Sequence, residues 1–477
     1  MASKKTLNAK NLEALGAERL AELLISISRG NAAAQRRLRL ELAGAASPGE
    51  MAQEIRKRLT TLARSRSFVD WHKRKALVAD LETQKQAIHQ LAKADAAEAL
   101  DLLWRFMALA NPILGRCDDS SGAVIGVFQA ACRDLGEMAR VAKVAPTTLA
   151  EQACRAVTEN EYGQYDGLIE VLAPTLGPAG LDHLKQLVLQ VSQEPVPKPR
   201  DQDRKVIGWG MSGPLYADDL AERHRSNVVR LSLAAIADAQ GDVDAFIAQQ
   251  SEKARRVPSV AAEIARRLLA AGRTEEAWAA INAADDDRPG WIPFEWEQTR
   301  IAVLEALGRS DEAQAFRWAC FERSLNPDHL RSYLKRLADF EDLEAEERAL
   351  SHALGHANVH HALSFLVTWP ALDQAVHLVL TRADELNGNF YEILAPAAAA
   401  LEAKHPLAAT VLCRALIDFA LEQNRVKRYQ HAARHLHECE SLAERIEDFG
   451  RFEPHDVYLR RLKDHHGRKS SFWSLVP

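Results

Sequence analysis

The sequence predicts an all-α protein in which an N-terminal helical domain precedes a helical-repeat region of the α-solenoid type. Glycine and proline, the residues that most often interrupt helices, number only 23 and 18 among 477 residues. Apolar residues recur at helical spacing, and one helix–turn–helix pattern repeats in the second half. The expected organisation is a helical domain at 1–191, a linker or ordered loop at 192–215, and a helical-repeat domain at 216–477.

Capping residues predict where helices of the first domain begin. Ser47 suits the N-cap and Pro48 the first turn of one helix, and Asp70 opens the next. Residues 97–109 are apolar along one side and are expected in the core. The sequence CDDSSG at 117–122 predicts a loop or a helix start, because Asp and Ser side chains compete for backbone hydrogen bonds.

Residues 192–215 interrupt the helical pattern with four prolines and three glycines. Proline lacks an amide donor and disfavours helix at the residue before it. Val206, Ile207 and Trp209 are nevertheless too apolar for a free coil. We therefore expect a linker whose second half is ordered.

The second half of the chain contains an internal repeat: LLAAGRTEEAW at 268–278 aligns with LEALGRSDEAQ at 304–314. The matched positions are Gly272 with Gly308, Arg273 with Arg309, Thr274 with Ser310, Glu276 with Glu312, and Ala277 with Ala313. Glycine ends the first helix where φ is positive, Thr or Ser caps the second, and alanine permits close helix packing. Such hairpins cannot bury their apolar faces alone, so they are expected to stack.

These units resemble the tetratricopeptide repeat, in which a glycine is followed by alanines and then a proline at fixed spacing. The unit near 258–290 matches that pattern at Gly272, Ala277, Ala284 and Pro289. The unit near 292–327 departs from it, since Ile301 and Cys320 replace small residues and Pro327 comes two residues late. A weaker related turn is expected at Gly241.

A second resemblance covers the whole chain and rests on four segments: RSFVDW at 66–71, CDDSSG at 117–122, VIGWGMSGPLYADD at 206–219 and HGRKSSFW at 466–473. In this order the chain resembles an uncharacterised bacterial family of all-helical proteins, a domain of unknown function. The layout is also similar to the helical region that follows the finger in SWIM zinc-finger proteins. This chain lacks the C-x-C and C-x-H pairs of that finger. The resemblance therefore implies a fold and a bacterial origin, and no activity.

Composition and motifs argue against several classes of protein. No apolar run reaches the length of a membrane span, and the N-terminal sequence MASKKTLNAKN lacks the apolar stretch of a secretory signal. The six cysteines form no C-x-x-C pair, which favours free thiols in a reducing cytoplasm. Phosphate-binding glycine loops, a nucleophile elbow and H-E-x-x-H are all missing. We therefore expect neither an enzyme nor a cofactor.

Positive charge is concentrated near the N-terminus, although the whole chain carries a net charge of −5. Residues 1–90 contain 17 Lys and Arg against 9 Asp and Glu. The residues that a nucleic acid would contact are Arg36, Arg37, Arg56, Lys57, Arg58, Lys73, Arg74 and Lys75. Interleaved leucines leave the alternative that these charges are only the solvated face of amphipathic helices.

Aromatic and histidine clusters supply the remaining candidate sites. Aromatic anchors for a protein partner are Trp278, Trp291, Trp296 and Trp318, unless these side chains are core. His352, His356 and His360 follow helical spacing and are weak metal candidates, although Gly355 and Asn358 are expected to break the helix. The same spacing recurs at His431, His435 and Cys439, where a zinc site would need a further ligand.

Together these patterns favour a non-enzymatic helical-repeat scaffold, or adaptor, that binds a protein partner. The alternative is a nucleic-acid-associated protein that uses the basic 36–75 region. A third hypothesis is a metalloprotein built on the histidine cluster at 352–360. The oligomeric state and the identity of the partner stay open.

Overall fold

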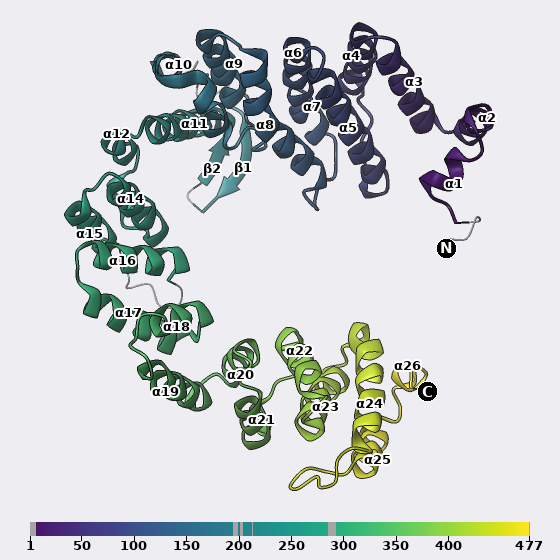
Figure 1. Cartoon of the computed structure of the whole chain (residues 1–477), viewed down its shortest axis with the longest axis vertical. Helices are drawn as coiled ribbons and strands as arrows, with labels where there is room; N and C mark the ends of the chain where they lie inside the picture. The colour runs from purple at the N-terminus through teal and green to yellow at the C-terminus, as the bar shows by residue number, and fades with distance from the viewer. Residues whose placement is uncertain (1–5, 194–198, 201–203, 212, 285–291, 477) are drawn as a thin grey trace. The chain divides into compact units, whose positions relative to one another are not determined.

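The computed structural model describes residues 6–193, 199–200, 204–211, 213–284 and 292–476 (Figure 1). The protein is mostly α-helical, as the sequence predicts. It divides into two compact units, Met1–Ala254 and Arg255–Pro477. Within the described ranges, no helix combines the length and the apolar character that crossing a bilayer requires.

The first unit is a series of helices interrupted by one β-hairpin. Its elements are α1 (Ala9–Glu13), α2 (Ala17–Ser28), α3 (Ala32–Ala46), α4 (Pro48–Arg64), α5 (Trp71–Ala92), α6 (Ala96–Met107), α7 (Ala110–Leu114), α8 (Ala123–Ala142), α9 (Pro146–Thr158), α10 (Leu168–Gln193), β1 (Val206–Gly210), β2 (Gly213–Tyr216), α11 (Ala217–Gln240) and α12 (Val243–Ala248), and the short α13 (Glu252–Arg255) reaches the boundary. The predicted helix starts are confirmed: the Ser47 hydroxyl accepts from the Glu50 amide at 3.1 Å, and the Asp70 carboxylate caps α5.

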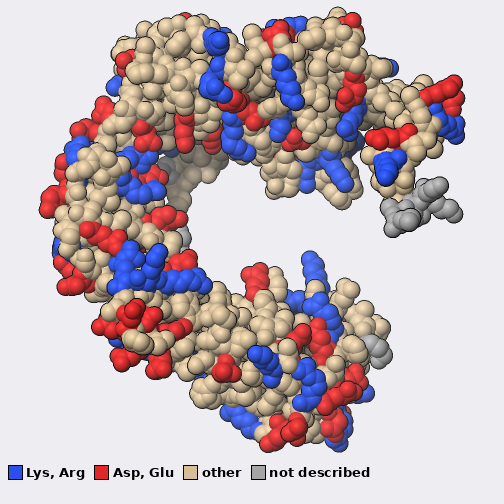
Figure 2. Space-filling view, viewed as in Figure 1, with Lys and Arg blue, Asp and Glu red and all other residues tan. Residues whose placement is uncertain are grey.

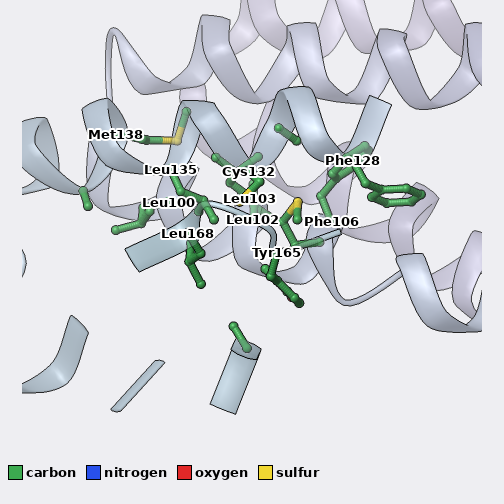
Figure 3. Packing of buried hydrophobic residues seen from close by; sticks show 14 of the residues in the cluster. Leu100, Leu102, Leu103, Phe106, Phe128, Cys132, Leu135, Met138, Tyr165 and Leu168 are labelled. Carbon is green, nitrogen blue, oxygen red and sulfur yellow. The ribbon is translucent and has the colours of Figure 1, made fainter. Parts of the chain in front are cut away.

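The apolar stretch at 97–109 lies in the core of this unit, as expected, where α6 packs against α8. Phe106 and Phe128 are fully buried, with ring centroids 5.2 Å apart (Figure 3). The CDDSSG segment is a capping loop, because both carboxylate oxygens of Asp119 accept backbone amides from the first turn of α8 at 2.8–2.9 Å.

The boundary between the units lies later than 192–215. Helix α11 packs along α10 and buries Ile236 in the first core, so the compact unit continues to Ala254. The ordered half of 192–215 forms a hairpin in which Trp209 pairs with Pro214. No strand was expected here, because glycine and proline are poor strand formers. Trp209 is 79% exposed.

The second unit contains helices joined by short turns. Its elements are α14 (Pro258–Ala270), α15 (Thr274–Asn282), α16 (Phe294–Ala306), α17 (Ser310–Ser324), α18 (Pro327–Leu334), α19 (Glu341–Gly355), α20 (Val359–Thr368), α21 (Leu372–Thr381), η2 (Ala383–Glu385), α22 (Tyr391–Leu401), α23 (Pro406–Glu422), η3 (Val426–Arg428), α24 (Tyr429–Ala443), α25 (His455–His466) and α26 (Ser470–Trp473). Consecutive helices contact one another through most of the series, and fully buried Phe472 docks α26 on α24.

The repeated hairpins α14–α15 and α16–α17 share one turn geometry. Gly272 and Gly308 both have φ of +73°, which is the conformation expected of a glycine that ends a helix. Gly241, with φ of +70°, ends α11 in the same way. Ala277 and Ala313 are fully buried, as close packing of the paired helices requires.

The expected capping by Thr274 and Ser310 is wrong. The N-cap residues are Arg273 and Arg309, and neither following hydroxyl makes a side-chain cap. Each arginine instead donates two hydrogen bonds to the carboxylate of the glutamate three residues later, with N–O distances of 2.5–2.7 Å. A carboxylate in the first turn interacts favourably with the positive end of the helix dipole and also attracts the guanidinium. Each of these helices therefore starts with an arginine–glutamate ion pair.

Candidate functional site

Six of the eight basic residues that a nucleic acid was expected to contact have acidic or backbone partners. Arg36 and Arg58 both pair with Asp80, and Arg56 pairs with Glu98. Lys57 pairs with Glu54 at 2.6 Å, Lys73 with Asp70 at 3.7 Å, and Arg74 donates to the Asp118 carbonyl oxygen. For Arg37 and Lys75, the described residues provide no such contact.

Each of these ion pairs places an acidic side chain beside a basic one. On the face drawn in Figure 2, blue and red side chains are interleaved over the helices of the first unit. One small basic pocket of about 160 Å³ remains between α3 and α4. It is lined by Arg36, Arg39, Lys57 and Arg58, with Glu54 and Gln84 beside them.

The tryptophans proposed as partner anchors have different environments. Trp296 is 3% exposed and its indole N–H donates to the Ile281 carbonyl oxygen at 3.2 Å, so it is a core residue. Trp278 and Trp318 are half-buried and lie under arginine side chains. Trp291 lies outside the described residues. Of the four tryptophans, Trp278 and Trp318 are therefore the half-buried ones among the described residues.

The histidines of α19 and α20 do not form a metal site. His352 contacts the Glu322 carbonyl oxygen at 2.9 Å, whereas His356 caps the end of α19. His360 is buried and its Nε2 accepts from the Asn387 amide at 2.9 Å. The helix ends at Gly355, as the sequence predicts, and this break turns the three rings toward different backbone partners. Burial lowers the pKa of His360.

The second unit contains a pocket of about 700 Å³ with many charged lining residues, here called the Arg414 pocket. It is bounded by residues 383–388, by α23, and by the segment that leads into α25. Gly388 permits this arrangement, because a Cβ atom there would lie 2.2 Å from the Ala415 carbonyl oxygen. The charged and aromatic lining residues are Asp384, Glu385, Arg414, Asp418, Phe419, Glu422, Arg451, Phe452, Glu453, Tyr458 and Arg461.

Two acidic side chains of the pocket have firm partners. Asp418 accepts from the Tyr458 hydroxyl at 2.9 Å and from Arg461 at 3.4 Å. Arg461 also donates to Glu453 at 3.0 Å. Burial, followed by the nearby Asp418 carboxylate, raises the pKa of Tyr458 well above its usual value, so its hydroxyl stays protonated.

Arg414 is the least satisfied charged group of the pocket. It is 8% exposed, and its guanidinium lies 4.4 Å from the ring centre of Tyr458. One nitrogen donates to the Glu453 carbonyl oxygen at 2.6 Å, whereas Nε and Nη2 have no hydrogen-bond partner among the described residues. Burial lowers the pKa of Arg414. Both nitrogens are shielded from solvent, so an acceptor oxygen of a ligand reaches them only when side chains of the pocket shift; a ligand that supplies such oxygens would satisfy them.

Sequence reasoning missed this pocket, although one signal was available. Helix α23 is apolar except for Thr410, Arg414, Asp418 and Glu422, which are spaced by four residues and share one face. A charged stripe on an otherwise buried helix is a marker of a polar site. The residues from 383–388 and α25 join this stripe only through the tertiary fold.

Comparisons with known proteins place the chain in one family. A solved structure described as "Circular tandem repeat protein with novel repeat topology and enhanced subunit contact surfaces" aligns with 96% of this chain and 95% of its own, at 15% identity. Its TM-score of 0.13 is too low for any argument about architecture. No curated protein matches. The profile of the family of unknown function DUF6880 matches residues 2–475, which confirms the expected membership of an uncharacterised family. The chain belongs to the family of unknown function DUF6880.

Proposed function

We propose that this protein is a non-enzymatic helical-repeat scaffold whose Arg414 pocket receives a peptide segment of a protein partner. The observation that carries the proposal is the buried Arg414 guanidinium, with two nitrogens that lack partners among the described residues. Each buried donor left without a hydrogen bond costs about 1–3 kcal/mol of stability, unless a bound group accepts from it. A binding role accounts for a cost that folding alone does not require.

The mixed chemistry of the pocket favours a peptide over a simple anion. Open donors on Arg414 suit backbone or side-chain carbonyl oxygens, whereas Asp418 and Glu453 retain lone pairs that accept N–H groups. Extended peptides present both kinds of group at regular spacing. A volume of about 700 Å³ also falls within the range of ligand-binding pockets, which is about 300–1,000 Å³.

The proposed scaffold has a tetratricopeptide-like plan in the second unit. Support comes from the equal φ values at Gly272 and Gly308 and from the buried alanines that follow them. Stacked hairpins of this kind present extended surfaces for partners. Trp278 and Trp318, each half-buried beside an arginine, are proposed as further contacts. The six free cysteines support a reducing, cytoplasmic location.

A non-enzymatic role is supported by how the ionisable groups of the pocket are arranged. Tyr458 donates its proton to Asp418 in a hydrogen bond, and Arg461 is shared between two carboxylates. Neither contact pairs a nucleophile with a free base, which is the arrangement that acyl transfer or hydrolysis needs.

The experiment is a peptide-display selection on the full-length wild-type protein, after which the affinity of each selected peptide is measured for the wild type and for the Arg414→Met variant. Methionine keeps the length and apolar stem of the side chain and removes the donors. Arg460→Met is the matched control, because Arg460 is an exposed α25 residue that pairs with Asp456 outside the pocket. We expect peptides that bind the wild type and R460M alike and bind R414M at least about tenfold more weakly, since one charged hydrogen bond contributes about 1.5–3 kcal/mol. Selected peptides that bind R414M as tightly as they bind the wild type would refute the proposal.

A second candidate function is binding of a nucleic acid by the first unit. One observation favours it: Arg36, Arg39, Lys57 and Arg58 converge on a single small pocket. A salt titration of DNA and RNA binding tests it, because each phosphate contact steepens the dependence of affinity on salt. We expect Arg39→Gln to reduce that slope by about one. Binding that is absent at low salt rejects this candidate.

A further inference from the structure

We propose that Cys413, His435 and Glu438 form a binding site for a divalent transition-metal ion of the zinc type, between α23 and α24. The three ligand atoms lie within 4.8 Å of one another. Cys413 is 2% and His435 7% exposed, so the site is buried except at the carboxylate. This inference is independent of the Arg414 pocket.

The helices present the three side chains to one point. His435 and Glu438 are three residues apart on α24 and share a face, and α23 contributes Cys413 from the helix packed against it (Figure 1). The Cys413 Sγ atom lies 3.9 Å from His435 Nδ1 and 3.9 Å from Glu438 Oε2. Nδ1 and Oε2 are 2.7 Å apart.

These separations are close to those of a tetrahedral zinc site. Zinc lies about 2.0–2.3 Å from nitrogen, oxygen and sulfur ligands, so ligand atoms are about 3.3–3.6 Å apart. Both sulfur distances would shorten by a few tenths of an ångström and the nitrogen–oxygen distance would open by about 0.6 Å. Side-chain rotations of that size require no movement of the helices.

The surroundings complete the site. Arg434 Nε lies 3.3 Å from Glu438 Oε1, so the guanidinium orients the carboxylate and leaves Oε2 for the ion. A cavity of about 100 Å³ adjoins the cluster and is lined by Cys413, His435, Glu438, Glu402 and Arg434. This space admits the ion and leaves a fourth coordination position for water. Cys439 is directed to the Thr410 carbonyl oxygen at 3.9 Å.

A catalytic cysteine–histidine arrangement does not fit the same atoms. In such a triad one imidazole nitrogen contacts the nucleophile and the other contacts the carboxylate. Here Nδ1 of His435 contacts both Cys413 and Glu438. A metal ion placed between the three atoms fits this geometry if two protons are displaced. The Cys413 thiol proton leaves to solvent, and the proton that Nδ1 of His435 shares with Glu438 moves to Nε2 or also leaves, so that all three atoms can bind the ion.

The second unit contains a comparable cluster that serves as a control. Glu297, Cys320 and His329 also lie within 4.8 Å of one another. However, Arg323 contacts the Glu297 carboxylate and lies 3.7 Å from Cys320 Sγ. A guanidinium therefore occupies the position that a cation would take, and we expect no ion there.

The test uses untagged full-length protein, reduced and stripped with a chelator, and titrated with Co²⁺ and then with Zn²⁺. We expect one equivalent of Co²⁺ to produce the absorption of a tetrahedral thiolate complex, and Zn²⁺ to displace it. Cys413→Ser and Glu438→Gln should each weaken binding by at least about 100-fold, because even second-shell changes cost about 10–100-fold. Cys320→Ser should leave binding unchanged.

Circular dichroism of each variant shows whether it folds. Glu438 is 37% exposed at its side chain, so Glu438→Gln preserves the core and decides the outcome even when C413S is unfolded. Absence of the cobalt–thiolate band in the wild type would overturn the proposal. A band that persists in E438Q at wild-type affinity, or one that disappears in C320S, would also overturn it.

Discussion

Replacement of Arg414 by methionine should leave the free energy of unfolding nearly unchanged, which is unusual for a buried charged residue. The change removes one charge-assisted hydrogen bond, worth about 1.5–3 kcal/mol, and a cation–π contact with Tyr458, worth about 0.5–2 kcal/mol. It also removes two buried N–H groups that lack partners among the described residues. Loss of each of these groups should stabilise the protein by about 1–3 kcal/mol. These contributions nearly cancel, so we expect the free energy of unfolding to rise by between zero and about 1 kcal/mol.

The matched comparison is Arg317→Met in the same unit. Arg317 is 1% exposed, and its three side-chain nitrogens donate to Glu305, Gln314 and Ser332. Because each of its three side-chain nitrogens is hydrogen-bonded, its removal should cost about 2–4 kcal/mol. The two buried arginines therefore differ in hydrogen bonding and are alike in burial.

The assay is urea-induced unfolding of the full-length wild type and both variants, followed by circular dichroism and tryptophan fluorescence. We expect the R414M midpoint to match or exceed that of the wild type and the R317M midpoint to fall. An R414M midpoint that falls as far as that of R317M would mean that the Arg414 donors are satisfied in the folded protein. Such a result would refute the proposal that a ligand binds at Arg414.

Three further predictions test the turns and the pH dependence. Burial holds the pKa of His360 below its value in the unfolded chain, so the unfolded state binds a proton more readily. The free energy of unfolding should therefore fall as the pH drops below about 6.5. His360→Gln should reduce this loss of stability between pH 7 and pH 5 in urea titrations, and equal losses in the wild type and the variant would contradict the prediction. Gly272→Ala and Gly308→Ala should each lower the free energy of unfolding by about 1–2 kcal/mol in the same assay. Both glycines have φ of +73°, and no neighbouring atom would crowd the added Cβ. Unequal losses would argue against the same turn geometry in the two hairpins. Gly388→Ala should cost about 1–3 kcal/mol by overpacking α23, and an unchanged midpoint would show that the 383–388 segment is not held against that helix.

Local features of the fold could be read from the sequence because they depend on residues close together in the chain. Helix starts at Ser47 and Asp70 depend on a capping side chain within three residues of its target. The turns at Gly272 and Gly308 need only one backbone conformation. The hairpin around Trp209 was missed because its glycines and Pro214 carry no strand signal.

Sites that depend on tertiary contacts could not be predicted in the same way. The Arg414 pocket joins residues more than 25 positions apart, and only its α23 face is visible in the sequence. Similarly, the spacing of His431, His435 and Cys439 indicated a zinc site, but nothing in the sequence indicated that Cys413 and Glu438 lie close to His435. The regular spacing of His352, His356 and His360 crosses the helix end at Gly355, which the sequence predicts.

The most direct measurement is a crystal structure of the full-length protein with a peptide from the display selection. We predict peptide oxygens within about 3.2 Å of Nε and Nη2 of Arg414, with peptide N–H groups on Asp418 or Glu453. A peptide bound at another surface, with both Arg414 nitrogens still unsatisfied, would contradict the proposal that this pocket binds the partner.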